Sequence, residues 1–286
     1  MESFQTLFSD GGAALIRLGL GSYGVAWGIG VTGYEAPPHP MDAHGLLHFA
    51  YGLGLRVVQI ADNLPLHMLS DGERAALRSD ADQLGMAVEV GTRGIRAENL
   101  ERYLAIARQF HSPILRVVVD TADHHPTPDE VVTLIRPHLT AFAQHSITLA
   151  IENHDRFKAQ TLADIITALD HPNVGICLDT VNSFGALEGP AHVVKVLGPY
   201  VVNLHVKEFV IRRVPHNMGF IVTGAPAGQG MLDIPWLLGE LHRHGRRFNA
   251  IIETWLSPEE TMTATVAREA EYVRESVGYL RGLIPD

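Results

Sequence analysis

The chain has 286 residues, enough for one large domain or two small ones, and 46% of them are hydrophobic, as in globular proteins with a large core. The net charge is −10 and no run of basic residues occurs, which argues against a nucleic-acid partner. A single cysteine excludes an internal disulfide, and no stretch approaches the roughly 18 consecutive apolar residues of a membrane helix. Residues 1–12 lack the features of a secretory signal. We therefore expect a cytoplasmic protein with no membrane partner.

Short apolar runs alternate with amphipathic helical patterns along the chain. The runs show little polar alternation, which is typical of strands buried on both faces of a parallel sheet. The eight predicted strands are Ile16–Leu20, Leu55–Ile60, Met86–Val90, Ile114–Val119, Thr148–Ile151, Val174–Leu178, Tyr200–Val206 and Asn249–Ile252. Eight strand–helix units without a break in composition predict a single (β/α)8 TIM-barrel domain over residues 1–286, with a doubly wound open sheet as the alternative.

Three capping patterns predict helix starts between these strands. Ser70 and Thr127 each precede a glutamate by three residues, and Ser257 repeats the pattern before the last helix. Pro137 lies inside the helix that follows Thr127, so we expect a kink or an early end there. The longest irregular stretch, Phe209–Leu232, is too long for a plain connection and predicts an extended functional loop after the seventh strand.

Each of the last four predicted strands runs into one ionisable residue, in order Glu152, Asp179, His205 and Glu253. The carboxyl ends of barrel strands form one mouth, and neighbouring strands are roughly 4.8 Å apart, so the four side chains can converge. Singly, such a residue is more often solvated or a cap partner, but crowded carboxylates need a cation between them. The set therefore predicts one divalent metal ion, Mn²⁺ or Mg²⁺ with Co²⁺ or Zn²⁺ as alternatives, and we favour Mn²⁺.

The motifs around these residues also match known ones. They read Ile151-Glu152-Asn153-His154, Cys177-Leu178-Asp179-Thr180, Leu204-His205-Val206-Lys207-Glu208 and Ile252-Glu253-Thr254-Trp255, and Gly228-Gln229-Gly230 is followed by Asp233. In order and spacing, nearly the whole chain resembles the xylose isomerase-like TIM-barrel superfamily. Within it the chain most resembles the sugar isomerase/epimerase branch typified by D-tagatose 3-epimerase. The motif is fairly specific for the superfamily and much less specific for a substrate.

The resemblance implies an enzyme that isomerises or epimerises a sugar or sugar-like ketone. In that branch the first and last glutamates, here Glu152 and Glu253, bind the metal and move protons. The metal lowers the cost of an enediolate, one glutamate removes the proton next to the carbonyl, and the other returns a proton. Asn182 stands where the family often has a histidine, and Ile211 where the epimerases have an arginine. Because of these departures, the substrate can differ from a free ketohexose.

Five residues are candidates for substrate contact, and each has an alternative role. Lys207 and His154 lie two residues after a predicted ligand and so face inward; Lys207 otherwise pairs with a neighbouring acid, and His154 otherwise supports a ligand. Asn182 can bond a sugar hydroxyl. Arg213 meets an anionic substrate or forms a surface ion pair, and Trp255 stacks on a sugar ring or packs at the barrel rim.

Other functions remain as alternatives. A dehydratase of a keto-inositol or keto-sugar would abstract the same proton and expel a hydroxyl, whereas an endonuclease IV-like phosphodiesterase would need more histidines and a basic groove. A non-catalytic binding barrel is opposed by four intact metal positions. We expect a small-molecule carbohydrate substrate. The apolar residues Met218, Phe220 and Ile221 predict that the extended loop covers the barrel mouth or contacts another subunit in a homo-oligomer.

Overall fold

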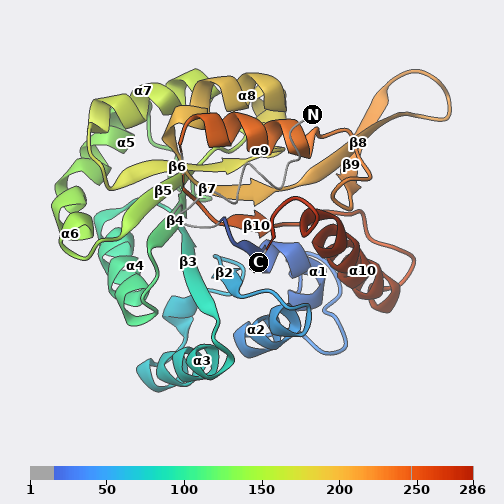
Figure 1. Cartoon of the computed structure of the whole chain (residues 1–286), viewed down its shortest axis with the longest axis horizontal. Helices are drawn as coiled ribbons and strands as arrows, with labels where there is room; N and C mark the ends of the chain where they lie inside the picture. Colours follow the sequence, from blue (N-terminus) through green and yellow to red (C-terminus); the bar gives the residue numbers. More distant parts are fainter. Residues whose placement is uncertain (1–15, 246, 286) are drawn as a thin grey trace.

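The computed structural model describes residues 16–245 and 247–285; residues 1–12, where we expect no secretory signal, lie outside this part. Parallel strands form a closed barrel in the order β1-β10-β7-β6-β5-β4-β3-β2 (Figure 1). Their bounds are β1 Leu18–Gly21, β2 Val57–Ile60, β3 Ala87–Arg93, β4 Ile114–Val118, β5 Thr148–Glu152, β6 Val174–Asp179, β7 Val201–Val206 and β10 Ala250–Ile252. The predicted (β/α)8 barrel is confirmed, and each strand lies within a few residues of its predicted position.

Helices surround the barrel (Figure 1). They are α1 Ala26–Ile29, α2 Ala43–Gly52, α3 Asp71–Leu84, α4 Ala97–Gln109, α5 Pro128–Ile135, α6 Leu139–Gln144, α7 Ala159–Leu169, α8 Pro190–Leu197, α9 Ile234–Arg243 and α10 Met262–Leu280. Their apolar sides join the outward-facing strand residues in one continuous hydrophobic core. No helix in the described part of the chain combines the length and the apolar character needed to cross a membrane.

Two of the three predicted helix starts are confirmed. The hydroxyls of Ser70 and Thr127 accept N–H bonds at the starts of α3 and α5, and the glutamate three residues later bonds back in each case. The helix after Thr127 also breaks at Pro137, where a 3₁₀ turn separates α5 from α6. The start at Ser257 is wrong: the last helix begins at Met262, because Thr261 rather than Ser257 accepts the capping N–H bond, from Ala264.

The stretch Phe209–Leu232 is more regular than predicted. Most of it forms an antiparallel hairpin of β8 Glu208–Arg213 and β9 Phe220–Ala225, which extends out from the body of the barrel (Figure 1). At its base, the buried Glu208 carboxylate accepts backbone N–H bonds from Phe209, Gly228 and Leu232.

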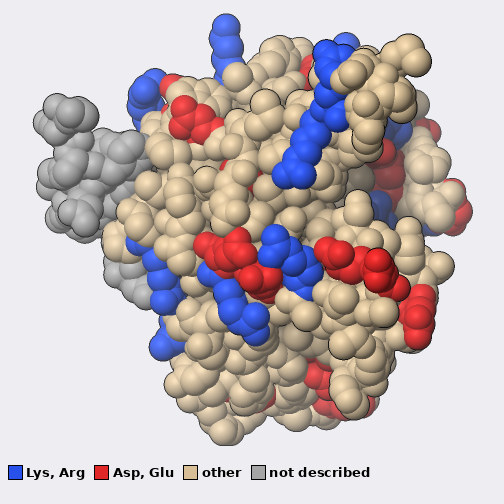
Figure 2. All heavy atoms as spheres, turned by 90° about the vertical axis from the view of Figure 1, so that its right-hand side faces the viewer, with Lys and Arg blue, Asp and Glu red and all other residues tan. Residues whose placement is uncertain are grey.

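The apolar residues near the hairpin tip face solvent. The exposed fractions of Met218, Phe220 and Ile221 are 79%, 62% and 56%. These side chains therefore do not pack on the barrel mouth in this chain, and their contact with another subunit stays a prediction. On the face shown in Figure 2, acidic and basic side chains are intermixed.

Candidate functional site

The four predicted ionisable side chains converge at one mouth of the barrel. Glu152 and Asp179 end β5 and β6, His205 lies next to the end of β7, and Glu253 directly follows β10. His205 Nδ1 lies 3.6 Å from Glu152 Oε2, 3.8 Å from Asp179 Oδ2 and 3.4 Å from Glu253 Oε1. All four residues are buried. Gly21 of β1 leaves room for them, because a Cβ there would lie 3.1 Å from Glu253 Oε1.

The donor set of this cluster suits a divalent cation. His205 Nδ1, Asp179 Oδ2 and both carboxylate oxygens of Glu253 are buried and have no hydrogen-bond partner among the described residues. Ligand atoms of these three residues lie within 4.8 Å of one another, so the group could hold a metal ion. Leaving buried polar atoms without partners is costly, and a cation between them would remove that cost.

Lys207 supplies a positive charge beside the cluster. Its Nζ lies 2.8 Å from Asp179 Oδ2 and 2.9 Å from Glu253 Oε2, which are ion-pair contacts without hydrogen-bond geometry. Although burial opposes ionisation, Lys207 and His205 hold the pKa of Asp179 well below its usual range. Burial likewise opposes ionisation of Glu253, but His205, Lys207 and Arg116 lower its pKa. The carboxylates are therefore already ionised and able to bind a cation.

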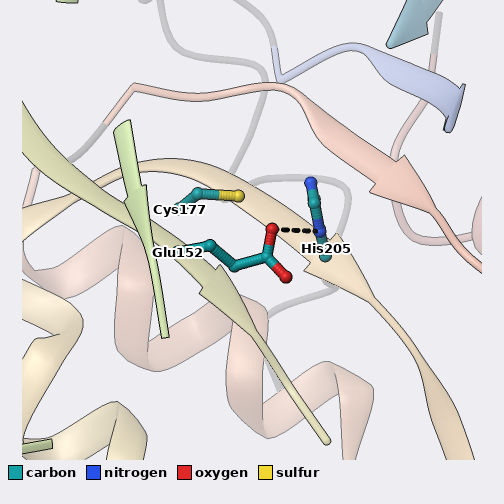
Figure 3. Close-up of side chains that lie close together, drawn as sticks. All are labelled: Glu152, Cys177 and His205. Atoms are coloured by element: carbon teal, nitrogen blue, oxygen red, sulfur yellow. Dashed lines mark ion pairs between the residues drawn. The ribbon is translucent and has the colours of Figure 1, made fainter. Parts of the chain in front are cut away.

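Cys177 lies in the same interior. It precedes Asp179 by two residues, and Figure 3 shows its sulfur beside the facing Glu152 and His205 side chains. Burial raises the pKa of the Cys177 thiol to about 11. The neutral S–H donates to Asn203 Oδ1 at 3.4 Å, so we assign Cys177 a packing role rather than that of an anionic ligand.

Arg116 is a site residue that the sequence argument missed. It is buried in β4, and its Nε donates to Glu152 Oε2. The second carboxylate oxygen of Glu152 accepts a bond from Asn182 Nδ2 at 2.8 Å. Arg116 Nη1 also donates to Asp62 Oδ1 at 3.0 Å, and Asp62 accepts further bonds from Tyr23 and Arg93. The signal for Arg116 was an arginine in the middle of an otherwise apolar strand.

Among the predicted substrate contacts, only Asn182 and Lys207 lie at the cluster. His154 is partly exposed and pairs with Asp155, because the strand ends at Glu152 and its alternation does not continue. Arg213 lies on the hairpin, where its guanidinium stacks 4.5 Å from the centre of the Phe220 ring. Trp255 Nε1 donates to the Glu208 carbonyl at 3.0 Å and so anchors the hairpin base.

Residues 47–283 match the model of the xylose isomerase-like TIM-barrel family. The chain belongs to this family. That confirms the resemblance inferred from the four strand-end motifs. Among curated relatives in the family, 3-oxo-isoapionate decarboxylase of Pectobacterium atrosepticum is 34% identical over 265 residues, which span 93% of this chain and 95% of the relative.

Solved structures share the same fold. D-psicose 3-epimerase, determined in the presence of D-fructose, has a TM-score of 0.70 at 14% identity, covering 95% of this chain and all of that one. A xylose isomerase-like barrel from Mycobacterium smegmatis, in complex with magnesium, has a TM-score of 0.65 at 17% identity, covering 99% of this chain and all of that one. At these identities the likeness establishes the fold, and the relatives named are enzymes with more than one kind of reaction.

Proposed function

We propose that the chain is a metal-dependent decarboxylase of a 3-oxo sugar acid, a small-molecule substrate of carbohydrate type. The 34% identity to 3-oxo-isoapionate decarboxylase over nearly the full length of both chains supports this reaction class. The observation that carries the proposal is that the two glutamates of the cluster have different surroundings. Both oxygens of Glu152 accept hydrogen bonds, whereas those of Glu253 have no hydrogen-bond donor among the described residues and one of them forms an ion pair with Lys207.

The proposed metal ligands are Glu152, Asp179, His205 and Glu253, with Mn²⁺ as the favoured ion and Mg²⁺, Co²⁺ or Zn²⁺ as alternatives. Three carboxylates and one imidazole suit such an ion. When bound, it would supply a Lewis acid that stabilises negative charge on a substrate oxygen.

The surroundings of Glu152 make it a poor proton carrier. Both of its oxygens accept bonds, one from the Arg116 guanidinium and one from Asn182. Both oxygens are therefore occupied by donors, which leaves neither placed to take a proton from a substrate carbon. Epimerisation requires one base to remove a proton and a second acid to return one, so both glutamates would have to exchange protons. Decarboxylation needs no proton removal from carbon and only one proton addition.

The proposed decarboxylation consumes one proton for each CO2 released. The bond between the substrate carboxylate and its neighbouring carbon breaks, and its electron pair forms the C=C bond of an enolate as CO2 leaves. One proton then adds to that carbon. We assign its delivery to Lys207, whose Nζ lies 2.9 Å from Glu253 Oε2 and whose side chain is 14% exposed. Although burial opposes it, Asp179 and Glu253 raise the pKa of Lys207, and a cation bound to these carboxylates would weaken that effect. Glu253 orients the ammonium group, and solvent restores the proton.

Isomerisation or epimerisation of a sugar-like ketone is the second candidate. It is favoured by the approach of both Glu152 and Glu253 to His205 Nδ1, within 3.6 and 3.4 Å. In that reaction the two glutamates would act as acid and base, as in the sugar epimerase branch. A dehydratase would use the same enolate and expel a hydroxyl.

The test is a substrate panel incubated with the Mn²⁺-loaded protein in heavy water. The panel contains 3-oxo sugar acids labelled with ¹³C at the carboxylate, ketoses and keto-inositols. We expect labelled CO2 from a 3-oxo acid and one deuterium in the product. Lys207→Met should lose at least about 100-fold in CO2 release while still binding Mn²⁺, as expected for loss of a general acid. Deuterium exchange into ketoses without CO2 release from any acid would instead establish the second candidate.

A further inference from the structure

A column of polar side chains, three of them buried, lies in the barrel interior behind the metal cluster. It consists of Gln59 on β2, Glu89 on β3, Asn203 on β7 and Asn249 just before β10. Gln59, Glu89 and Asn203 are at most 1% exposed. The column meets the cluster at His205, whose Nε2 lies 2.7 Å from Gln59 Oε1. The reaction described above uses none of the four column residues.

The column begins at Glu89, whose pKa is raised by burial and lowered by the amide donors around it. The Glu89 carboxylate is contacted by three amide nitrogens, Gln59 Nε2 at 3.0 Å, Asn203 Nδ2 at 3.0 Å and Asn249 Nδ2 at 2.6 Å. Each of these nitrogens is a donor. The contact set of Glu89 thus fits a carboxylate anion and fixes which end of each amide faces it.

The orientation of Gln59 follows from its two nitrogen contacts. Gln59 Nε2 donates to Glu89 Oε2 at 3.0 Å and to Asn203 Oδ1 at 2.9 Å, so both of its hydrogens are used. Turning the amide over would set its oxygen against two acceptors. Gln59 Oε1 therefore faces His205 Nε2 and must accept a hydrogen from it.

We propose that Gln59 is a positioning residue that keeps a hydrogen on His205 Nε2, so that Nδ1 is the nitrogen left to bind the cation, and that Glu89 acts through Gln59. A metal-binding imidazole is neutral and carries one N–H, so a hydrogen kept on Nε2 leaves the lone pair of Nδ1 for the cation. Nδ1 is the atom that faces Glu152, Asp179 and Glu253, and it has no hydrogen-bond partner among the described residues. The column thus prepares the imidazole to bind the cation. This inference rests on the proposed function, because it concerns the same metal site.

If the column only stabilised the fold, substituting Gln59 would not weaken metal binding. Gln59→Leu keeps a side chain of similar size but removes the acceptor at His205 Nε2. Loss of such a partner of a metal-binding histidine typically weakens metal affinity 10–100-fold. Ser112→Ala is the matched control. Ser112 is equally buried and accepts a bond from the Val90 backbone N–H, but it lies outside the column.

The test combines metal titration with a direct view of the tautomer. Mn²⁺ binding to metal-free protein is measured by calorimetry for wild type, Gln59→Leu and Ser112→Ala. We expect about 10–100-fold weaker binding only in Gln59→Leu. In parallel, long-range ¹H–¹⁵N spectra of ¹⁵N-histidine-labelled protein, with His205 assigned by its loss in His205→Gln, should show protonation at Nε2 in wild type.

Two results would overturn the inference. One is a metal-free wild type in which His205 Nε2 carries no hydrogen, a result that needs no variant to fold. The other is a Gln59→Leu protein that binds Mn²⁺ as tightly as wild type. By contrast, a wild type that binds no divalent ion but carries a hydrogen on His205 Nε2 supports the positioning role and contradicts the proposed function. The two failures are thereby distinguishable.

Discussion

The pairing of Arg116 with Glu152 predicts a large and metal-dependent stability effect. The two side chains are 2% and 1% exposed, so neither charge is solvated by bulk water. Arg116→Leu leaves the Glu152 carboxylate buried with Asn182 as its remaining donor. Removing one partner of a buried ion pair typically costs about 3–5 kcal/mol. We expect a loss of this size in metal-free protein and a smaller one with saturating Mn²⁺, because the cation would neutralise Glu152.

The assay is urea unfolding at pH 7, followed by circular dichroism, with and without Mn²⁺. Arg96→Leu is the control, because the ion pair of Arg96 with Asp123 is exposed and should be worth about 0–1 kcal/mol. Adding Glu152→Gln to Arg116→Leu should recover part of the loss by removing the unpaired charge. If Arg116→Leu costs no more than Arg96→Leu, or if Mn²⁺ does not change the difference, our account of Glu152 as an arginine-held metal ligand is wrong.

Three further predictions concern catalysis, pH and assembly. Glu253→Gln should lower turnover by about 100-fold or more and weaken Mn²⁺ binding, measured by kinetics and calorimetry, because it removes a ligand charge and the anion that holds the proton donor. Burial raises the pKa of Glu269 to about 7 in the native protein, whereas the unfolded chain releases this proton near pH 4.5. The free energy of unfolding therefore falls as the pH rises from about 4.5 to about 7. Between pH 5 and pH 8, the free energy of urea unfolding of the wild type should fall by roughly 3 kcal/mol more than that of Glu269→Gln. If the difference between the two proteins is the same at both pH values, the raised pKa is contradicted. If the hairpin joins two subunits, replacing Met218, Phe220 and Ile221 with serine should convert an oligomer to monomers in light scattering; a wild type that is already monomeric would rule out the arm.

The barrel and its strand-end residues are predictable because their signals are local. Apolar runs mark strands buried on both faces, and parallel strands present their carboxyl ends at one mouth. Glu152, Asp179 and Glu253 each end or directly follow such a run, and the structure brings them to His205. The caps at Ser70 and Thr127 are equally local, since three residues decide each one.

The polar barrel interior was harder to predict because it depends on strand register. Gln59, Glu89, Arg116 and Asn203 each stand inside an apolar strand, and the sequence alone does not say which of them face one another. In the barrel, Gln59 lies opposite Glu89 in the register of β2 and β3. Polar residues within buried strands were the signal that could have identified this interior.

Other differences between the sequence predictions and the structure come from a competing cap nearby or from contacts distant in the sequence. Ser257 has the local pattern of a helix cap, but Thr261 caps the last helix instead. Trp255 looked like a stacking residue and is bound to the carbonyl of Glu208, 47 residues away. The hairpin after β7 gives no strand signal in the sequence, because its antiparallel pairing has few apolar alternations and its apolar tip is exposed.

The most direct test of the central claim is anomalous diffraction from crystals of the protein grown with Mn²⁺. We predict one strong peak at the barrel mouth, roughly 2.0–2.6 Å from carboxylate oxygens of Glu152, Asp179 and Glu253 and from Nδ1 of His205. A peak at another place, or no peak when Mn²⁺ is present well above its dissociation constant, would contradict the account.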